Sequence, residues 1–327
     1  MAVAMDSVWG ATHLQRGEVF SSVIKEMFMD QTFAAAMVRQ ISDFGDGKNY
    51  KISSIGELVV DQMSESVSLP ERRPDTGQFV FNINEFVGTK VPFTDVFLED
   101  DFLASAAIAT LPRKMKRAFD EYYESQVLKL QRVQTNNNGN VINTARHRYT
   151  ANGATRQITL QDIAYARFAL QKAKAPLQNL VGIVDPSFEF NTNITATIVD
   201  ISNNARWQGI IETGIGAGDS IRFLRNIYGF DIYVSDYLDS ELAIEAALTD
   251  YQGNVTATVV GDKVNQFMCL ADDECKPYIG AWRRSPKITS WRDEDVETEY
   301  HQLSARFGLN LYRPESLVSI VSSTVLN

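Results

Sequence analysis

The residues best able to bind a metal or act as nucleophiles are three histidines and two cysteines in a chain of 327 residues. His13, His147 and His301 are far apart in the sequence, and none has another histidine or a cysteine at metal-ligand spacing. Cys269 and Cys275 match no common zinc motif, and two cysteines are too few for a secreted disulfide scaffold. We expect free thiols, no metal centre and no cofactor.

The glycine-rich segment 214–219 is a candidate for a nucleotide-binding loop or a hydrolase site. Its sixth position is Asp219, where a dinucleotide-binding fingerprint requires a small residue. Ser220 lies in a Gly-Asp-Ser-Ile sequence similar to the nucleophile block of one esterase family, but no Asp-x-x-His follows it. We interpret the segment as a mobile loop and keep a serine hydrolase using Ser220 as an alternative.

The overall charge restricts the classes of partner. Lysine and arginine number 31 against 41 aspartates and glutamates, which gives a net charge of −10 and argues against binding nucleic acid by neutralising phosphates. Neighbouring carboxylates are common in such a chain, so they do not indicate acid/base catalysis. We find no signal peptide and no apolar run of the ~18 residues that cross a membrane, and expect synthesis in a reducing, intracellular place.

The first hundred residues predict a helix followed by a long hairpin. Apolar residues recur at helical spacing over 18–41, and glycines at 45 and 47 end that helix. Strands are predicted over 50–63 and 79–83, joined by a polar segment. The first strand would reach roughly 45 Å, and a two-stranded ribbon of that length is marginal in water. It must fold back on its own domain or find a surface on another molecule, which suggests an assembly protein.

Two helices are predicted next, over 97–111 and from Pro112 to about 133, because proline ends or kinks a helix and is tolerated in a first turn. The second helix has an apolar stripe that includes Phe119, Tyr122 and Val127. Its first turns carry four basic residues: Arg113, Lys114, Lys116 and Arg117. They form either a solvated face, paired in part to acids at i+4, or a docking surface for acidic groups on a neighbour.

The remainder of the chain mixes helix and strand, which predicts an α+β fold. Thr159 and Asp162 form a capping-box pattern at the start of a helix that runs to about residue 174. Strands are predicted over 180–184, 230–234, 287–291, 300–311 and 317–321.

The order of these elements resembles the tailed-bacteriophage major capsid protein family, whose shell fold is the Hong Kong 97 type. The resemblance covers nearly the whole chain, while its individual motifs are weak. It rests on the helix leading into the strand that ends at Pro186, on the sequence 228–235, and on the strand and turn at 307–314.

This resemblance implies a division of the chain into the family's parts. Residues 1–46 correspond to an N-terminal arm, and 47–93 to an extended loop, a long β-hairpin over a neighbouring subunit. Residues 94–133 correspond to a peripheral domain with a spine helix, and 134–278 to an axial domain. Residues 279–313 return to the peripheral domain, and 314–327 give a C-terminal strand in the axial domain.

The implied function is an icosahedral head of pentamers and hexamers that encloses the double-stranded DNA of a tailed phage. The chain would act in the virion, after assembly in the host bacterial cytoplasm. Expected partners are sister copies, a separate scaffolding protein, a portal protein and a possible cement protein, with no sequence-specific DNA contact and no membrane. A separate scaffold is expected because 327 residues leave no space for the scaffolding segment of some family members.

We also expect a non-covalent shell, because residues 61–78 contain no lysine for the isopeptide cross-link of some members. The best intersubunit candidates are the charges at the loop tip, which would meet the basic helix of a neighbour: Glu71, Arg72, Arg73 and Asp75. A bacterial nanocompartment shell is the alternative within the same fold, and a tail or decoration protein is a third possibility.

Overall fold

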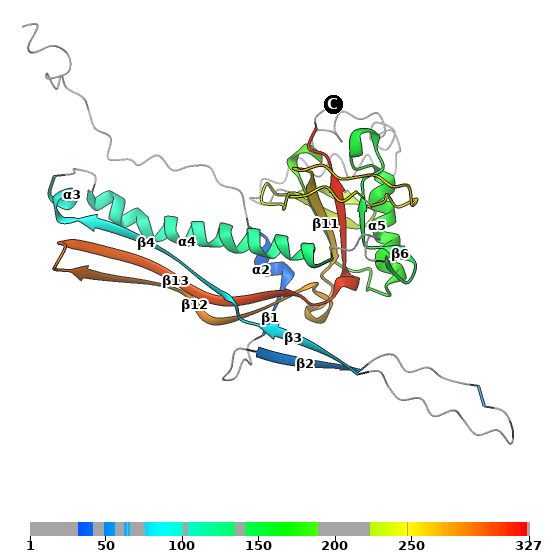
Figure 1. Cartoon of the computed structure of the whole chain (residues 1–327), viewed down its shortest axis with the longest axis horizontal. Helices are drawn as coiled ribbons and strands as arrows, with labels where there is room; N and C mark the ends of the chain where they lie inside the picture. The colour runs from blue at the N-terminus through cyan, green and yellow to red at the C-terminus, as the bar shows by residue number, and fades with distance from the viewer. Residues whose placement is uncertain are drawn as a thin grey trace, which may run out of the picture.

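The computed structural model describes residues 32–41, 49–55, 62–63, 65, 76–100, 104–134, 141–188, 223–246 and 248–325. The described chain has two parts, which we call the arm and the body (Figure 1). The arm is a long four-stranded sheet with one long helix along it, and the body is a six-stranded sheet covered by a shorter helix. Mixed helix and sheet confirm the predicted α+β class.

The arm sheet has the strand order β1-β12-β13-β4. Its strands are β1 (Val38–Ile41), β12 (Tyr278–Asp293), β13 (Thr298–Leu311) and β4 (Glu85–Thr94). The pair β1–β12 is parallel, whereas β12–β13 and β13–β4 are antiparallel. Beyond Ala281, β12 pairs with β13 alone among the described residues, so its outer side is an edge. This stretch carries three basic residues and a proline: Arg283, Arg284, Lys287 and Pro286. Charged side chains and proline on an exposed edge hinder pairing with a further strand.

The helix α4 (Ala104–Lys129) follows the short α3 (Asp95–Asp100) and continues into the 3-10 turn η1 (Leu130–Gln134). The prediction that Pro112 opens a second helix is wrong, because α4 runs through it. Leu111 and Met115, on either side of the proline, pack into the same core, and this packing offsets the loss of one backbone hydrogen bond. Tyr123 rather than Tyr122 completes the buried stripe with Phe119.

The predicted helix over 18–41 is wrong at its C-terminal end. The described residues form only α2 (Ala34–Met37) before the chain becomes β1. Val38 pairs with Tyr278 in parallel register and is buried against β12. The backbone hydrogen bonds of a distant strand therefore decide the conformation here, whatever the local periodicity.

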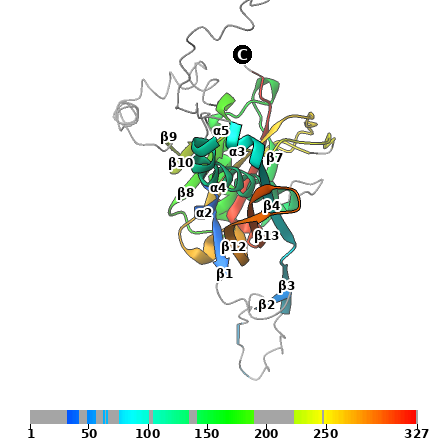
Figure 2. The ribbon, with the colours of Figure 1, turned by 90° about the vertical axis from the view of Figure 1, so that its left-hand side faces the viewer.

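The predicted hairpin is present as a ribbon of β2 (Asn49–Ile55) and β3 (Thr76–Asn82), which pair with each other alone among the described strands. Both views place it on the side of the arm sheet opposite α4 (Figures 1 and 2). Its base packs on the arm, where Phe81 lies in one cluster with Ile279 and Ala281. The described part of β2 is Asn49–Ile55, and residues 56–61 of the predicted strand lie outside the described residues. Directly after the ribbon comes β4, a strand that the sequence analysis missed.

The body sheet has the order β7-β14-β11-β8-β10-β9. Its strands are β7 (Arg148–Thr150), β14 (Leu317–Ser322), β11 (Lys263–Cys269), β8 (Leu180–Val184), β10 (Phe230–Val234) and β9 (Phe223–Ile227). A small pair, β5 (Val141–Ile142) and β6 (Ala145–Arg146), precedes it, and the 3-10 turns η2 (Ala154–Arg156), η3 (Asp273–Cys275) and η4 (Pro314–Ser316) lie in the connections.

The helix α5 (Leu160–Lys172) covers one face of the body sheet. The predicted capping box is confirmed, because Thr159 and Asp162 exchange side-chain and backbone hydrogen bonds. The opposite face of the sheet packs into the arm core, where Ile183 and Met268 lie in one cluster with Leu128 of α4. The arm and the body thus share a core. The predicted strands at 180–184 and 230–234 are confirmed.

Candidate functional site

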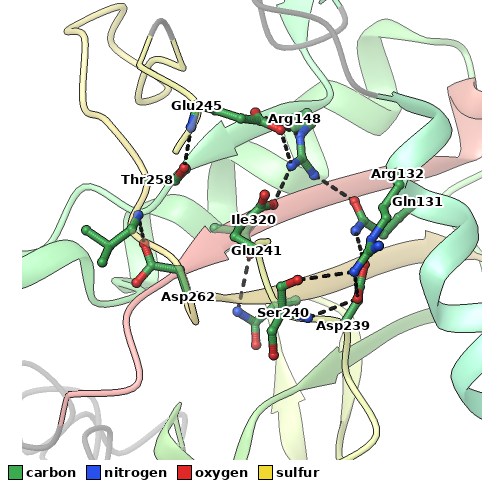
Figure 3. Close-up of polar contacts among 12 residues, drawn as sticks. Gln131, Arg132, Arg148, Asp239, Ser240, Glu241, Glu245, Thr258, Asp262 and Ile320 are labelled. Atoms are coloured by element: carbon green, nitrogen blue, oxygen red, sulfur yellow. Dashed lines mark hydrogen bonds and ion pairs between the residues drawn. The ribbon is translucent and has the colours of Figure 1, made fainter. Parts of the chain in front are cut away.

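A buried network of charges joins the body to the end of the arm helix (Figure 3). Arg148, on β7, is 1% exposed and donates hydrogen bonds to Glu241, to Glu245 at 2.9 Å and to Gln131 of η1 at 2.6 Å. Gln131 in turn donates to Asp239 at 3.0 Å. The network ties the loop segment 235–262 and the helix end to one strand, which is a structural task.

The electrostatics of this network follow from its burial. Desolvation raises the pKa of Glu241, and the Arg148 guanidinium opposes that rise. The paired Asp239 raises the pKa of Arg132. Every acid of the group has an arginine or glutamine beside it, so the network provides no unpaired acid or base for catalysis.

The basic residues predicted as a docking surface lie on the first half of α4. Arg113, Lys114 and Lys116 are exposed, while Arg117 is half-buried and pairs with Glu121 at 3.2 Å. The last contact confirms the i+4 pairing expected for a solvated face, and the three exposed residues are accessible to a partner. The other predicted contact residues, Glu71, Arg72, Arg73 and Asp75, lie outside the described residues.

The arm sheet has a second charged surface, which the sequence analysis did not identify. A pocket of about 600 Å³ opens where the ribbon joins the arm. Its lining consists of Ile83, Asn84, Phe86, Arg283, Arg284 and Arg306. The sequence signal was present, but recognising it required the register that places Arg306 between Phe86 on β4 and Arg284 on β12.

Towards the far end of the arm, an aromatic group lies on the same sheet. Lys90 is 3.6 Å from the ring centroid of Tyr300 and 5.0 Å from that of Trp291. The two rings are stacked with their centroids 5.5 Å apart. Trp282, nearer the body, instead packs with Tyr123 and Phe307 in the arm core. These contacts make Trp282 part of the arm core.

Ser290, His301 and Glu299 form the one row that resembles a catalytic triad among the described residues. Ser290 Oγ is 2.7 Å from His301 Nδ1, and His301 Nε2 is 3.5 Å from a carboxylate oxygen of Glu299. The row lies across the paired strands β12 and β13, whose backbone groups bond to each other. An oxyanion hole needs N–H donors beside a substrate pocket, and none of the three residues lines the pocket described above, so we assign the row a structural part in linking β12 and β13.

The remaining predictions concern the cysteines, a metal centre, a membrane span and the glycine-rich segment. Both cysteines are free thiols, with Cys269 buried, as expected. No group of histidine, cysteine and acidic residues within the described residues could hold a metal ion. No helix in the described part of the chain is long and apolar enough to cross a membrane. Ser220 and the glycine-rich segment lie outside the described residues.

Comparison with solved structures finds the same architecture in phage capsids. A structure from Mycobacterium phage Che8 is 16% identical, with 94% of this chain and 97% of that chain covered and a TM-score of 0.62. The mature capsid of bacteriophage PhiM1 is 12% identical, with coverage of 95% and 93% and a TM-score of 0.60. The capsid of Ralstonia phage GP4 is 9% identical, with coverage of 96% for both chains and a TM-score of 0.60. At identities this low, the structural similarity establishes the fold alone.

A comparison with curated proteins gave no match, whereas a comparison with family models did. The family model described as phage capsid protein matches residues 78–320, a span that begins in β3 and ends in β14. Since this span is most of the chain, the protein belongs to the phage capsid protein family, has the Hong Kong 97-type fold and is a structural component of a virion, not an enzyme.

Proposed function

We propose that this chain is the major capsid protein of a tailed phage, assembling as pentamers and hexamers into an icosahedral head around double-stranded DNA. The observation that carries the proposal is the ribbon of β2 and β3. Its two strands pair only with each other among the described residues, and Val80 on it is 41% exposed. A ribbon of two strands gains stability when a further surface covers it.

Solved relatives support the symmetry in this proposal. A structure described as the capsid of an empty GTA particle with C5 symmetry has a TM-score of 0.56 and covers 99% of this chain. That description combines a chain of the same fold with five-fold symmetry of the capsid. Pentamers of the present chain are therefore a geometrically reasonable unit of its shell.

In this proposal the arm is the peripheral domain with α4 as its spine helix, and the body is the axial domain around local symmetry axes. The ribbon is the base of the extended loop. Residues 1–46 form the family's N-terminal arm, which is a different part from the sheet and helix that we call the arm. The shared core of arm and body supports a subunit that moves as one unit, because Leu128 and Met268 are both fully buried in it.

The contacts between copies are proposed to be non-covalent. The loop-tip charges Glu71, Arg72, Arg73 and Asp75 meet the exposed basic residues of a neighbour's α4. Exposed ion pairs contribute ~0 to 1 kcal/mol each, so these contacts select the register more than they provide stability. Many modest interfaces per subunit hold the shell together. A ladder of linked chains on denaturing gels of mature particles would overturn this part of the proposal.

The proposed partners are a separate scaffolding protein, a portal protein and a possible cement protein. The net charge of −10 supports a shell that encloses DNA without binding its phosphates tightly. Assembly takes place in the host bacterial cytoplasm.

Electron microscopy of particles purified from cells that make this chain together with its scaffolding protein tests the proposal. We expect closed icosahedral shells, and nuclease-resistant double-stranded DNA inside particles from infected cells. Cargo protein in place of DNA would favour a nanocompartment, and rings or tubes would favour a tail protein. Either result contradicts the proposed head.

A matched pair of variants tests the helix surface. Lys114→Glu with Lys116→Glu reverses two exposed charges on the proposed interface, and Lys129→Glu with Lys172→Glu reverses two exposed lysines outside it. We expect fewer closed particles from the first variant and a wild-type yield from the second. Equal yields from both would remove the α4 surface from the interface.

A further inference from the structure

The pocket where the ribbon joins the arm contains two arginines that have no acidic partner within the described residues. Arg284 and Arg306 are directly opposite each other on β12 and β13, and both are exposed. Like charges in such cross-strand positions repel. Neither arginine forms an ion pair within the described residues, and the one hydrogen bond seen runs from Arg284 to Ser304 Oγ at 3.4 Å. Arg283 also lines the pocket.

The far end of the same hairpin holds the opposite charge. Residues 292–299 contain one arginine and five acids. Arg292 is engaged by Asp95 at 2.6 Å and by Glu294 at 3.0 Å. Asp295 and Glu297 are exposed on the turn between β12 and β13 and have no ion pair in the described part of the chain.

The two surfaces also match in their apolar content. Phe86 is 67% exposed and stands among the arginines of the pocket. Val296 is 55% exposed and stands among the acids of the turn. A turn of four residues that carries one apolar side chain between carboxylates is a suitable size for a pocket of about 600 Å³.

The pocket and the acidic turn of one molecule cannot meet. Arg284 and Asp293 are nine positions apart on β12, which at ~3.3 Å per residue is about 30 Å of paired strand. Figure 1 shows the turn beside α3 at the free end of the arm, and the base of the ribbon near the other end.

We infer that the pocket of Phe86, Arg284 and Arg306 receives the acidic turn 293–297 of a second copy of this chain. This inference rests on the proposed shell function and assigns one of its contacts. Carboxylates that reach the pocket accept charge-assisted hydrogen bonds from guanidinium groups, which relieves the repulsion between the two arginines. The contact is heterologous, so each joined pair leaves one pocket and one turn free for further copies.

Two charge-reversed chains test the contact. The pocket-reversed chain carries Arg284→Glu and Arg306→Glu, and the turn-reversed chain carries Asp295→Lys and Glu297→Lys. Each of these chains presents like charges at the contact, whereas a third chain that carries all four substitutions restores opposite charges at every contact between its copies. Sedimentation and negative-stain microscopy measure the concentration at which half of the chain has assembled, and circular dichroism with thermal unfolding checks that each unassembled subunit is folded.

We expect each of the two reversed chains to need at least about tenfold more protein to assemble than wild type, and the chain with all four substitutions to return to within about twofold. The control with Lys129→Glu and Lys172→Glu should assemble like wild type. A pocket-reversed chain that assembles normally overturns the inference, and so does a chain with all four substitutions that assembles as poorly as the two reversed chains. Wild-type chain that forms no assembly even together with its scaffolding protein would instead contradict the proposed shell itself.

Discussion

The buried arginine of the body and the exposed arginines of the arm pocket differ in whether acidic side chains of the same subunit balance their charge. In the body, Arg148 is 1% exposed and bonds to Glu241 and Glu245, so its charge is balanced within the subunit. On the arm, Arg284 and Arg306 are exposed, oppose each other and have no acidic partner among the described residues. The charge of Arg148 is therefore balanced within the subunit, whereas the proposed contact balances the two arm arginines with acids of a second molecule.

Apolar side chains show the same contrast. Phe267 of the body is fully buried and packs edge-on against Phe230 with ring centroids 5.2 Å apart. Phe86 of the arm is 67% exposed beside the arginine pocket. Removing a buried side chain such as Phe267 should therefore reduce subunit stability, whereas removing an exposed side chain of the arm pocket should mainly affect assembly. The predictions below separate these two properties.

The largest effect should come from Arg148→Ala. Removing this arginine leaves Glu241 and Glu245 without their buried partner, and breaking a buried ion pair in this way costs about 3–5 kcal/mol. Urea unfolding of unassembled subunits measures the loss. Arg284→Ala is the matched control on the arm and should change the free energy of unfolding by no more than about 0.5 kcal/mol. Similar losses for both variants would erase the distinction between the two regions.

Phe267→Ala should cost about 3 kcal/mol, because it removes a fully buried ring and leaves a cavity in the body. Phe86→Ala, the same change on the arm, should leave subunit stability nearly unaltered and reduce assembly. Thermal unfolding of subunits and the yield of particles measure the two properties separately. A large loss of subunit stability from Phe86→Ala would show that the arm surface is a core.

A smaller effect should follow from the titration of His147, which is buried in the body. Burial lowers the pKa of His147 below its ordinary value of 6.5. The unfolded chain therefore binds more protons in this range, so the stability that neutral His147 contributes is present above pH 6.5 and declines as the pH falls towards the lowered pKa.

The variant His147→Asn removes the titration and keeps a donor for the carbonyl of Leu317, 3.0 Å from His147 Nδ1. The free energy of unfolding of wild type relative to this variant should fall between about pH 8 and about pH 5. A constant difference across this range would show that His147 is not responsible.

The smallest effect should come from Lys90→Gln on the arm. Lys90 lies over the rings of Tyr300 and Trp291, and an exposed cation–π contact contributes about 0.5–1 kcal/mol. Equilibrium unfolding of subunits should show a loss of that order, and Lys129→Gln, which changes an exposed lysine elsewhere, should show none. A loss above about 2 kcal/mol would mean that the arm depends on this surface more than its exposure indicates.

Much of the body could be predicted from local signals. The capping box of Thr159 and Asp162 fixes the start of α5 within three residues of sequence. Alternating apolar residues identified β10, and a short apolar run ended by Asp185 and Pro186 identified β8. These features depend on neighbours along the chain, so a single sequence reveals them.

The arm could be predicted only in part. Its long helix was recognised from the apolar stripe, but the continuation of α4 through Pro112 depends on packing against the sheet. The strand β1 depends on Tyr278 and the residues after it, which are more than two hundred positions away. The candidate site was missed for the same reason, because Phe86, Arg284 and Arg306 become neighbours only through strand register.

The sequence by itself determined the α+β class, the helix caps, several strands and the order of elements that resembles phage capsid proteins. Tertiary structure alone decided which charges are buried as partners and which remain exposed. The physical reason is distance. Periodicity and capping act within one or two turns of chain, whereas the balance of charge at Arg148 or Arg306 depends on side chains that are brought together only when strands pair and cores pack.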